Sequence, residues 1–484
     1  MQQDKGGEQK FYRLLGLFNL LVFFLFAPSL WGSFEDFKHK QNQSFAKYKD
    51  ERDAAFDKFL KQQWEAYKAQ APEQMYAKPK PKSITPSPPT AFTPVGPMVR
   101  IELEQLPLTP LDTPKEKLLQ NDLVFNFFGI DVGFAIDESI KKAKFYPHSQ
   151  VGVSNFFTTA AQSQHEHLLK SIQTYSQNLE LNDWGVYLLT KELSLRVYKG
   201  EDEAKLLTWF LLSKLGYNVK VGIANGHVEV LHHSKKIIYA TPSYTFDGEK
   251  FYLLADYAKK NLKKIHSYKQ DYPNATKPLD LALGTLPKIG QSSKEKELKF
   301  SQKSKEYRVS FTYNQHLIDF MASYPQADYD TFFNAPLEHQ TYDTVAKGLK
   351  AHIDGKQASE ALNFILHFVQ SAFIYERDDE QFGREKVMFA QETLVYDKSD
   401  CEDRAVLYAY LVKKLLKIGV IGIKYSDHMA TALYIPPMGD TLNLANRKFV
   451  VADPTYVNAN IGQSMPKYKS KMPQSFIVVR KDAS

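Results

Sequence analysis

The chain has 484 residues, of which 43% are hydrophobic and 13% are aromatic, so it can bury substantial cores and is not an intrinsically disordered protein. Its net charge of +7 is modest for this length, and its lysines occur in short runs, which favours a solvated surface over nucleic-acid binding. The single cysteine, Cys401, excludes an internal disulfide bond.

Residues 1–32 are typical of an export signal. The basic residues Lys5, Lys10 and Arg13 precede an apolar run over residues 14–27. That run is shorter than the roughly 20 residues of a membrane span, and it matches the hydrophobic region of a signal peptide. We therefore predict a protein of the periplasm or cell envelope, with this segment either cleaved or retained as an N-terminal membrane anchor. A retained anchor is the only membrane contact that we expect.

Residues 33–70 contain an aromatic repeat with a period of 11 residues. One series is Phe34, Phe45, Phe56 and Tyr67, and no glycine or proline interrupts it. A period of 11 corresponds to about 3.67 residues per turn, so the aromatic side chains form a stripe along one helix. The stripe has to pack against the globular body, a second copy or a protein partner. The helix is therefore either a plain packing element or a docking and self-association element.

Residues 71–116 contain eleven prolines. Proline prevents regular helix and favours the extended polyproline II conformation. We predict a semi-rigid linker, with a PxxP-type protein ligand as the alternative interpretation.

Residues 117–290 and 291–484 follow the same order of predicted elements, which indicates a duplicated domain. The polar, lysine-rich residues 291–306 are expected to join the two copies. The first copy has predicted strands at 123–128, 219–223, 227–231 and 236–244, and helices at 184–198 and 203–215. The second has predicted strands at 307–313, 420–425, 428–434 and 448–456, and helices at 358–372 and from 401 onward.

Superposing the two copies aligns His227 with His428 and residues 242–244 with residues 454–456. In that register, Glu201 falls at the position of Cys401 and Thr241 at that of Asp453. The first copy is then a degenerate one, which keeps the hydrophobic frame and lacks the nucleophile and the acid.

Cys401 is expected in the first turn of a helix, with Ser399 or Asp400 as its N-cap. The unpaired N–H groups and the helix dipole favour a thiolate at that position. The other interpretation is an inert buried cysteine. The neighbouring Asp400 and Glu402 argue against that interpretation, because they are charged.

His428 begins a predicted strand, and Asp453 ends another, directly before Pro454. Antiparallel neighbouring strands bring such side chains to about 5 Å from one another. A thiol, an imidazole and a carboxylate are the three groups that cysteine-dependent acyl transfer needs. We therefore predict a catalytic triad of Cys401, His428 and Asp453. Residues 376–383 form either a rim or lid over this site or an ordinary polar loop.

The run Asp400-Cys401-Glu402-Asp403-Arg404-Ala405, the His428 strand and the run Ala452-Asp453-Pro454-Thr455 resemble the transglutaminase-like cysteine enzymes, including bacterial transglutaminase-like cysteine proteinases. The resemblance covers residues 360–460, and residues 184–245 as a degenerate copy. It implies an α+β fold with a papain-like core, in which a helix carrying the cysteine packs on an antiparallel sheet carrying the histidine and the aspartate.

The resemblance implies Cys401 as nucleophile, His428 as general base and acid, and Asp453 as the residue that orients the imidazole. The triad itself requires no cofactor. Some bacterial relatives bind calcium beside the cysteine, and Asp400 and Glu402 match that position. The alternative role of these two carboxylates is to interact with the helix dipole. The Gln-Cys-Trp motif of eukaryotic transglutaminases is absent, so the backbone N–H of Cys401 is the one oxyanion donor that can be named.

The sequence thus predicts an exported cysteine hydrolase of the peptidase or amidase type, acting on protein or peptide substrates of the envelope or outside the cell. The alternatives are a catalytically silent scaffold or binding protein of the envelope, and a transamidase.

Overall fold

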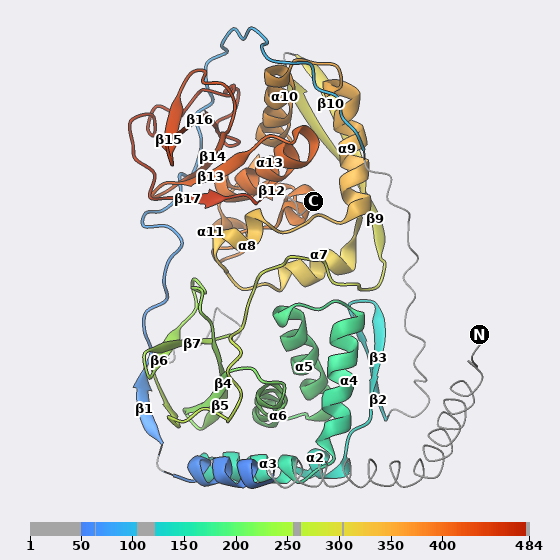
Figure 1. Ribbon diagram of the computed structural model, residues 1–484, viewed down its shortest axis with the longest axis vertical. Helices are drawn as coiled ribbons and strands as arrows, with labels where there is room; N and C mark the ends of the chain where they lie inside the picture. The colour runs from blue at the N-terminus through green and yellow to red at the C-terminus, as the bar shows by residue number, and fades with distance from the viewer. Residues whose placement is uncertain (1–49, 63, 104–121, 255–262, 303, 481–484) are drawn as a thin grey trace, which may run out of the picture. The chain divides into compact units, whose positions relative to one another are not determined.

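The computed structural model describes residues 50–62, 64–103, 122–254, 263–302 and 304–480 (Figure 1). The chain divides into two compact units, residues 1–61 and 62–484. The described part of the first unit is helical from residue 50 to residue 60. The export signal and residues 33–49 of the predicted helix lie outside the described residues. Within the described ranges, no helix combines the length and the apolar character that crossing a bilayer requires.

The prediction of one helix up to residue 70 is wrong at its C-terminal end. The helix ends at Leu60, and Glu65–Lys68 form the strand β1, which pairs with β8 (Lys264–Ser267). The ring of Tyr67, a member of the aromatic repeat, lies 4.1 Å from that of Phe246. Packing at a sheet edge therefore takes precedence over the helical period at this position.

The N-terminal half of the second unit contains a six-stranded antiparallel sheet, in the order β1-β8-β4-β5-β7-β6. Helix α6 packs on β4 and β5, and α5 packs on α6. The new strands are β4 (Val219–Ala224), β5 (His227–His233), β6 (Ser243–Phe246) and β7 (Glu249–Leu253). The helices are α2 (Glu138–Lys142), α3 (Gln150–Ala161), α4 (His165–Asn178), α5 (Asp183–Val197) and α6 (Glu201–Lys214).

The C-terminal half contains a five-stranded antiparallel sheet, in the order β15-β16-β14-β13-β17. Its strands are β13 (Val420–Lys424), β14 (Met429–Leu433), β15 (Thr441–Leu444), β16 (Arg447–Ala452) and β17 (Ser475–Val478). Its helices are α7 (Gln315–Ala322), α8 (Tyr329–Phe333), α9 (His339–Ile353), α10 (Ala358–Ser371), α11 (Asp378–Gln381), α12 (Ala390–Val395) and α13 (Cys401–Leu416). The protein is therefore of the mixed α+β class, with two antiparallel main sheets.

Three two-stranded pairings complete the described structure. Two are antiparallel hairpins, and one is a short parallel pair. They are β2 (Leu123–Phe127) with β3 (Ile130–Phe134), β9 (Ser293–Gln302) with β10 (Lys305–Asn314), and β11 (Ile374–Tyr375) with β12 (Lys398–Ser399). The polar residues 291–306, expected as a joint, are thus mostly strand. The reason is that Leu298 and Phe300 alternate with the exposed Glu297, Lys299 and Ser301 and bury one face of β9.

Helix α13 is the central element of the C-terminal half, and Figure 1 shows it beside β13 and β14. It also packs on α10 and α12. Leu407, Leu411 and Val412 have no exposed surface, and neither do Tyr408 and Ala409. A helix that is apolar on all sides is a buried core helix. Its N-terminus is consequently held inside the protein.

The two main sheets share one strand order. Across the first sheet, the strands β4 to β8 lie in the order β8-β4-β5-β7-β6. Across the second sheet, the strands β13 to β17 lie in the order β17-β13-β14-β16-β15. In each half, one helix packs on two corresponding strands: α6 packs on β4 and β5, and α13 packs on β13 and β14. The alignment of residues 242–244 with residues 454–456 is wrong in this arrangement. Residues 243–246 form β6, whereas residues 454–456 follow β16, the counterpart of β7.

The proline-rich residues 71–103 lack regular secondary structure, as predicted, but they are not a free spacer. The backbone N–H groups of Lys78 and Ser87 donate to the carbonyls of Ser426 and Val457, at 2.9 and 2.8 Å. Farther along, Val99 N–H donates to Lys356 O at 2.8 Å. This segment therefore lies against the C-terminal half over much of its length.

Candidate active site

Cys401 is the first residue of α13, as the sequence predicted, and Asp400 is the N-cap. The N–H of Asp400 donates to Asp403 Oδ2 at 3.1 Å, which closes the first turn. Arg404 is buried and donates to Ser399 Oγ, Gln370 O and Phe373 O, at 3.1, 3.2 and 2.8 Å. These bonds fix the start of α13 against the end of α10, and so fix the position of the thiol.

His428 and Asp453 form the pair that the strand pattern predicted. His428 directly precedes β14 and Asp453 directly follows β16, two strands that are paired through Thr431 and Ala452. His428 Nε2 lies 2.8 Å from Asp453 Oδ2, and both side chains are buried. The second oxygen of Asp453 accepts from Thr455 N–H at 3.0 Å. The carboxylate is therefore held in place and orients the imidazole ring.

The ring of Tyr468 stacks on the imidazole of His428 with the centroids 4.8 Å apart. The other imidazole nitrogen, Nδ1, is buried and has no hydrogen-bond partner among the described residues. A buried polar atom without a partner is costly, so it marks a position where a partner is expected. The ring thus presents one anchored nitrogen and one available nitrogen.

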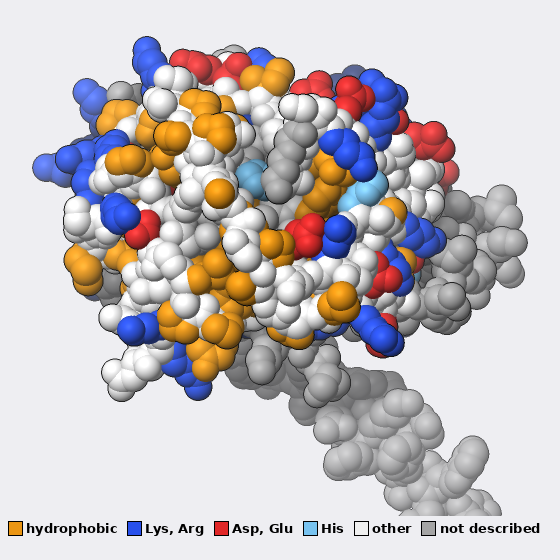
Figure 2. All heavy atoms as spheres, turned by 90° about the horizontal axis from the view of Figure 1, so that it is seen from above, with side chains coloured by type: hydrophobic (Ala, Val, Ile, Leu, Met, Phe, Trp, Pro, Cys, Tyr) orange, Lys and Arg blue, Asp and Glu red, His pale blue; other side chains and the backbone are white. Residues whose placement is uncertain are grey.

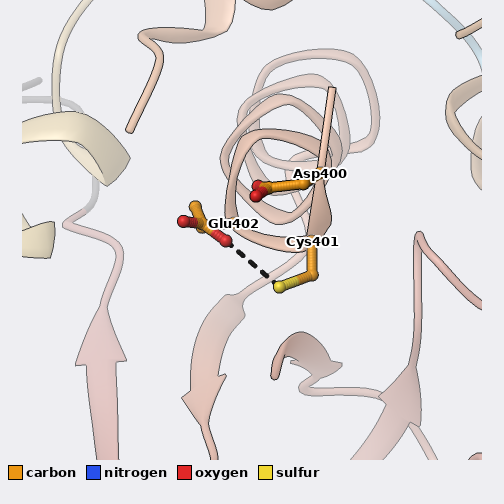
Figure 3. Close-up of side chains that lie close together, drawn as sticks. All are labelled: Asp400, Cys401 and Glu402. Carbon is orange, nitrogen blue, oxygen red and sulfur yellow. Dashed lines mark hydrogen bonds between the residues drawn. The ribbon is translucent and has the colours of Figure 1, made fainter. Parts of the chain in front are cut away.

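Cys401 Sγ does not use that available nitrogen in this conformation. The thiol instead donates to Glu402 Oε2 at 3.1 Å (Figure 3). Tyr76 also lies beside the thiol, with its hydroxyl oxygen 3.8 Å from Sγ. The same hydroxyl donates to Glu402 Oε2 at 3.0 Å. The structure therefore pairs His428 with Asp453 by a hydrogen bond, and it leaves Cys401 outside that pair.

The expectation that the helix N-terminus favours a thiolate does not hold for this conformation. Burial raises the pKa of the Cys401 thiol well above its ordinary value, and the carboxyl groups of Glu402 and Asp400 add to the increase. The helix dipole is worth about 0.3–1 kcal/mol at an exposed terminus. Complete burial beside two acidic residues outweighs a contribution of that size.

The sequence reasoning missed Lys80, which comes from the proline-rich segment and is 7% exposed. Its ammonium contacts four carboxyl groups, which we call the acidic cluster: Asp378 at 3.0 Å, Glu385 at 2.7 Å, Asp400 at 2.5 Å and Glu402 at 2.7 Å. Asp378 is the first residue of α11, so the polar run at 376–383 turns a carboxylate inward. The alternation of lysine and proline at 78–81 is the one sequence signal for Lys80, and it indicates an extended chain without indicating burial.

The charges of the acidic cluster depend on Lys80. Burial opposes ionisation of Glu402, but the Lys80 ammonium and hydrogen bonds lower its pKa to about 2. Burial raises the pKa of Asp378 to about 6, in spite of Lys80. Burial and the Glu402 charge raise the pKa of Glu385 to about 8. Near neutral pH, Glu402 and Asp378 are therefore ionised beside the Lys80 ammonium, whereas Glu385 retains its proton.

Asp400 and Glu402, the residues expected to bind calcium, belong to this cluster. Among the described residues, two groups of three carboxylates, and a third group in which Cys401 joins Asp400 and Glu402, have ligand atoms within 4.8 Å of one another, which is the spacing of a cation site. The ammonium of Lys80, however, already contacts Asp400 and Glu402. These carboxyl groups, as arranged, cannot hold a calcium ion and the Lys80 ammonium at the same time, because a divalent cation has to displace the ammonium.

A cavity of about 620 Å³ lies elsewhere in the C-terminal half. It is bordered by the end of α9, the start of α10 and part of the proline-rich segment, and its lining includes Phe92, Lys305, His352, Phe364 and His367. Figure 2 shows a hollow with hydrophobic and histidine side chains on the face that contains these elements. Cys401 and His428 do not line this cavity, so we do not assign the predicted chemistry to it.

Comparison of the chain with known proteins assigns it to no family. No protein-family model, no curated protein and no solved structure matches the chain.

Proposed function

We propose that the protein is an exported cysteine hydrolase of the transglutaminase-like type, which cleaves amide bonds in envelope or extracellular proteins or peptides. The observation that carries the proposal is the buried pair of His428 and Asp453. His428 Nδ1 has no hydrogen-bond partner among the described residues, and the imidazole stacks on Tyr468. Burial, Asp427 and, to a smaller extent, the neighbouring Cys401 raise the pKa of Tyr468. Export rests on residues 1–32 of the sequence alone.

The two halves support the geometry that the proposal needs. In the first half, His227 begins β5 and contacts Asp202, at the start of α6, with 3.1 Å between Nδ1 and Oδ2. In the shared strand order, β14 takes the place of β5. His428 therefore corresponds to His227, and the start of α13 corresponds to the start of α6. We infer that the halves are duplicated copies with a papain-like core. The histidine then faces the helix N-terminus in both, and the nucleophile is present only in the second.

In the proposed reaction, Cys401 Sγ attacks the carbonyl carbon of the scissile amide and its proton passes to His428 Nδ1. The C–S bond forms, the C–N bond breaks, and the amine leaves with the proton from Nδ1. His428 then removes a proton from water as the water oxygen bonds to the acyl carbon, the C–S bond breaks to release the acid, and the proton returns to Cys401 Sγ. Asp453 holds the ring and stabilises the imidazolium. An amine in place of water makes the same enzyme a transamidase.

One rotation of the Cys401 side chain has to precede this chemistry, because the thiol donates to Glu402 in the observed conformation. The same contact favours a second candidate, a catalytically silent envelope scaffold that retains the fold. Replacing Cys401 in the native host separates the two. The scaffold predicts that Cys401→Ala leaves the phenotype unchanged while deletion of residues 33–70 abolishes it.

The direct test is cleavage of an unbiased peptide mixture, read by mass spectrometry, with the wild-type chain and with Tyr76→Gly. We expect products that disappear with Cys401→Ala and fall by at least about a thousandfold with His428→Ala. Adding a labelled primary amine distinguishes hydrolysis from transamidation. If neither the wild-type chain nor Tyr76→Gly forms products that depend on Cys401, the enzymatic function is wrong.

A further inference from the structure

A peptide segment already occupies the surroundings of Cys401, and it belongs to this chain. Residues 75–81 form neither helix nor strand. Met75 and Lys80 are buried, whereas Lys78 and Lys82 on either side of Lys80 are exposed. Only selected side chains of the segment therefore point into the body.

The segment is held by its backbone as well as by its side chains. Lys78 N–H donates to Ser426 O at 2.9 Å, two residues before His428. Tyr375 Oη donates to the carbonyl of Pro81 at 2.7 Å. Contacts to backbone groups do not depend on the side chains of a peptide, and they are a common means of binding extended peptides.

Two side chains provide the specific contacts. Tyr76 covers Cys401, with its hydroxyl 3.8 Å from Sγ and bonded to Glu402. Lys80 places its ammonium among the four carboxyl groups of the acidic cluster. Ion pairs of this kind, buried and multiply bonded, are specific for a cationic side chain.

We propose that residues 75–81 act as a built-in peptide inhibitor, which closes the Cys401 site until the segment withdraws, and that the same groove accepts extended peptides carrying a lysine. The inference rests on the proposed function, since it identifies the regulation and the substrate class of that site. Two observations carry it: Tyr76 lies on the thiol, and Lys80 is surrounded by the acidic cluster. Withdrawal exposes Cys401 and leaves the carboxyl groups available to a substrate lysine.

The experiment is the rate of alkylation of Cys401 by iodoacetamide at pH 7, measured by mass spectrometry on the full chain. We expect slow labelling of the wild type and labelling that is about tenfold faster or more in Tyr76→Gly and Lys80→Met, because each loses the side-chain contacts by which that residue anchors the segment. Lys82→Met is the matched control, since Lys82 is exposed directly after the segment, and it should label at the wild-type rate. Equal rates in all four chains overturn the inhibitor.

Thermal unfolding and near-UV circular dichroism establish whether each variant is folded. If Lys80→Met does not fold, because its carboxyl groups have lost their counter-charge, Tyr76→Gly decides the question. A rate for Lys82→Met as high as that for Tyr76→Gly also overturns the proposal, because the segment then acts only as general packing.

Peptide recognition is tested in trans. A synthetic peptide of residues 73–82, added at a concentration on the order of millimolar to Lys80→Met, should slow alkylation. The same peptide with methionine in place of its lysine at position 80 should not. Protection by both peptides, or by neither, overturns the lysine-reading groove. Failure of the enzymatic function has a different signature, since the labelling differences persist while no peptide is cleaved.

Discussion

At the scale of single residues, the site combines a hydrogen-bonded pair, His428 and Asp453, with a thiol that Tyr76 contacts from a distant part of the chain. His428 and Asp453 were placed at the ends of strands, and they meet at 2.8 Å because β14 and β16 are neighbours. Cys401 was placed at a helix N-terminus, which is confirmed. Its ionisation was not predictable, because the burial of Sγ depends on distant residues such as Tyr76, and the local pattern does not show that Asp400 and Glu402 turn inward beside it. Local rules carry no information on such contacts.

The raised pKa values in the acidic cluster predict how the free energy of unfolding changes with pH. The folded protein holds the Glu385 proton up to about pH 8, while the unfolded chain releases it near the ordinary value of 4.5. The unfolded state therefore binds fewer protons between these values, and the free energy of unfolding falls as the pH rises from about 4.5 to about 8. Asp378, with its pKa raised to about 6, acts in the same direction up to that pH.

Glu385→Gln should therefore show a smaller loss of melting temperature between pH 5 and pH 8 than the wild type. Differential scanning calorimetry at the two pH values measures it, with Glu380→Gln as a control, because Glu380 lies on the exposed side of α11. An unchanged pH dependence in Glu385→Gln contradicts the partly buried, protonated state of Glu385.

At the scale of elements, the predicted helices of the two halves are confirmed as α5, α6, α10 and α13, because their hydrophobic periods are unambiguous. The helices α3, α4 and α9 were not predicted, and the strand expected at 236–244 is confirmed only at its end, where β6 begins. Two failures have physical causes. The 11-residue repeat extends through Tyr67, yet residues 65–68 pair with β8 because an open sheet edge offers backbone hydrogen bonds. Residues 291–306 were expected as a joint, since the lysines conceal the alternation that buries Leu298 and Phe300. Tertiary pairing decided both.

The packing of α8 on the second sheet gives a test at this scale. Gly422 lies in β13, and a Cβ atom there would come within 2.9 Å of Phe333 Cζ and 3.2 Å of Ile477 Cβ. Gly422→Ala should therefore lower the free energy of unfolding by about 1–3 kcal/mol. Chemical denaturation measures it, with Gly284→Ala as the matched control, since a Cβ at Gly284 meets nothing within 4 Å. Equal stability of the two variants contradicts the close contact between α8 and β13.

At the scale of the whole chain, two features connect distant parts of the sequence. The sheets of the two halves repeat one strand order, and the proline-rich segment reaches from the first sheet to the site of Cys401. The order of elements predicted a repeat, although the repeated helix–strand pattern alone did not fix the register after β5. The role of the proline-rich segment was not predictable, because an extended chain has no periodicity from which its buried side can be identified.

The central claim is that Cys401 and His428 form a working pair once the thiol is released. The most direct measurement is the pH dependence of iodoacetamide labelling in Tyr76→Gly, compared with Tyr76→Gly carrying His428→Gln. We predict an inflection well below the value of about 8.5 for a free thiol, which disappears when the imidazole is removed. The same inflection in both chains, at or above the value of a free thiol, contradicts the claim.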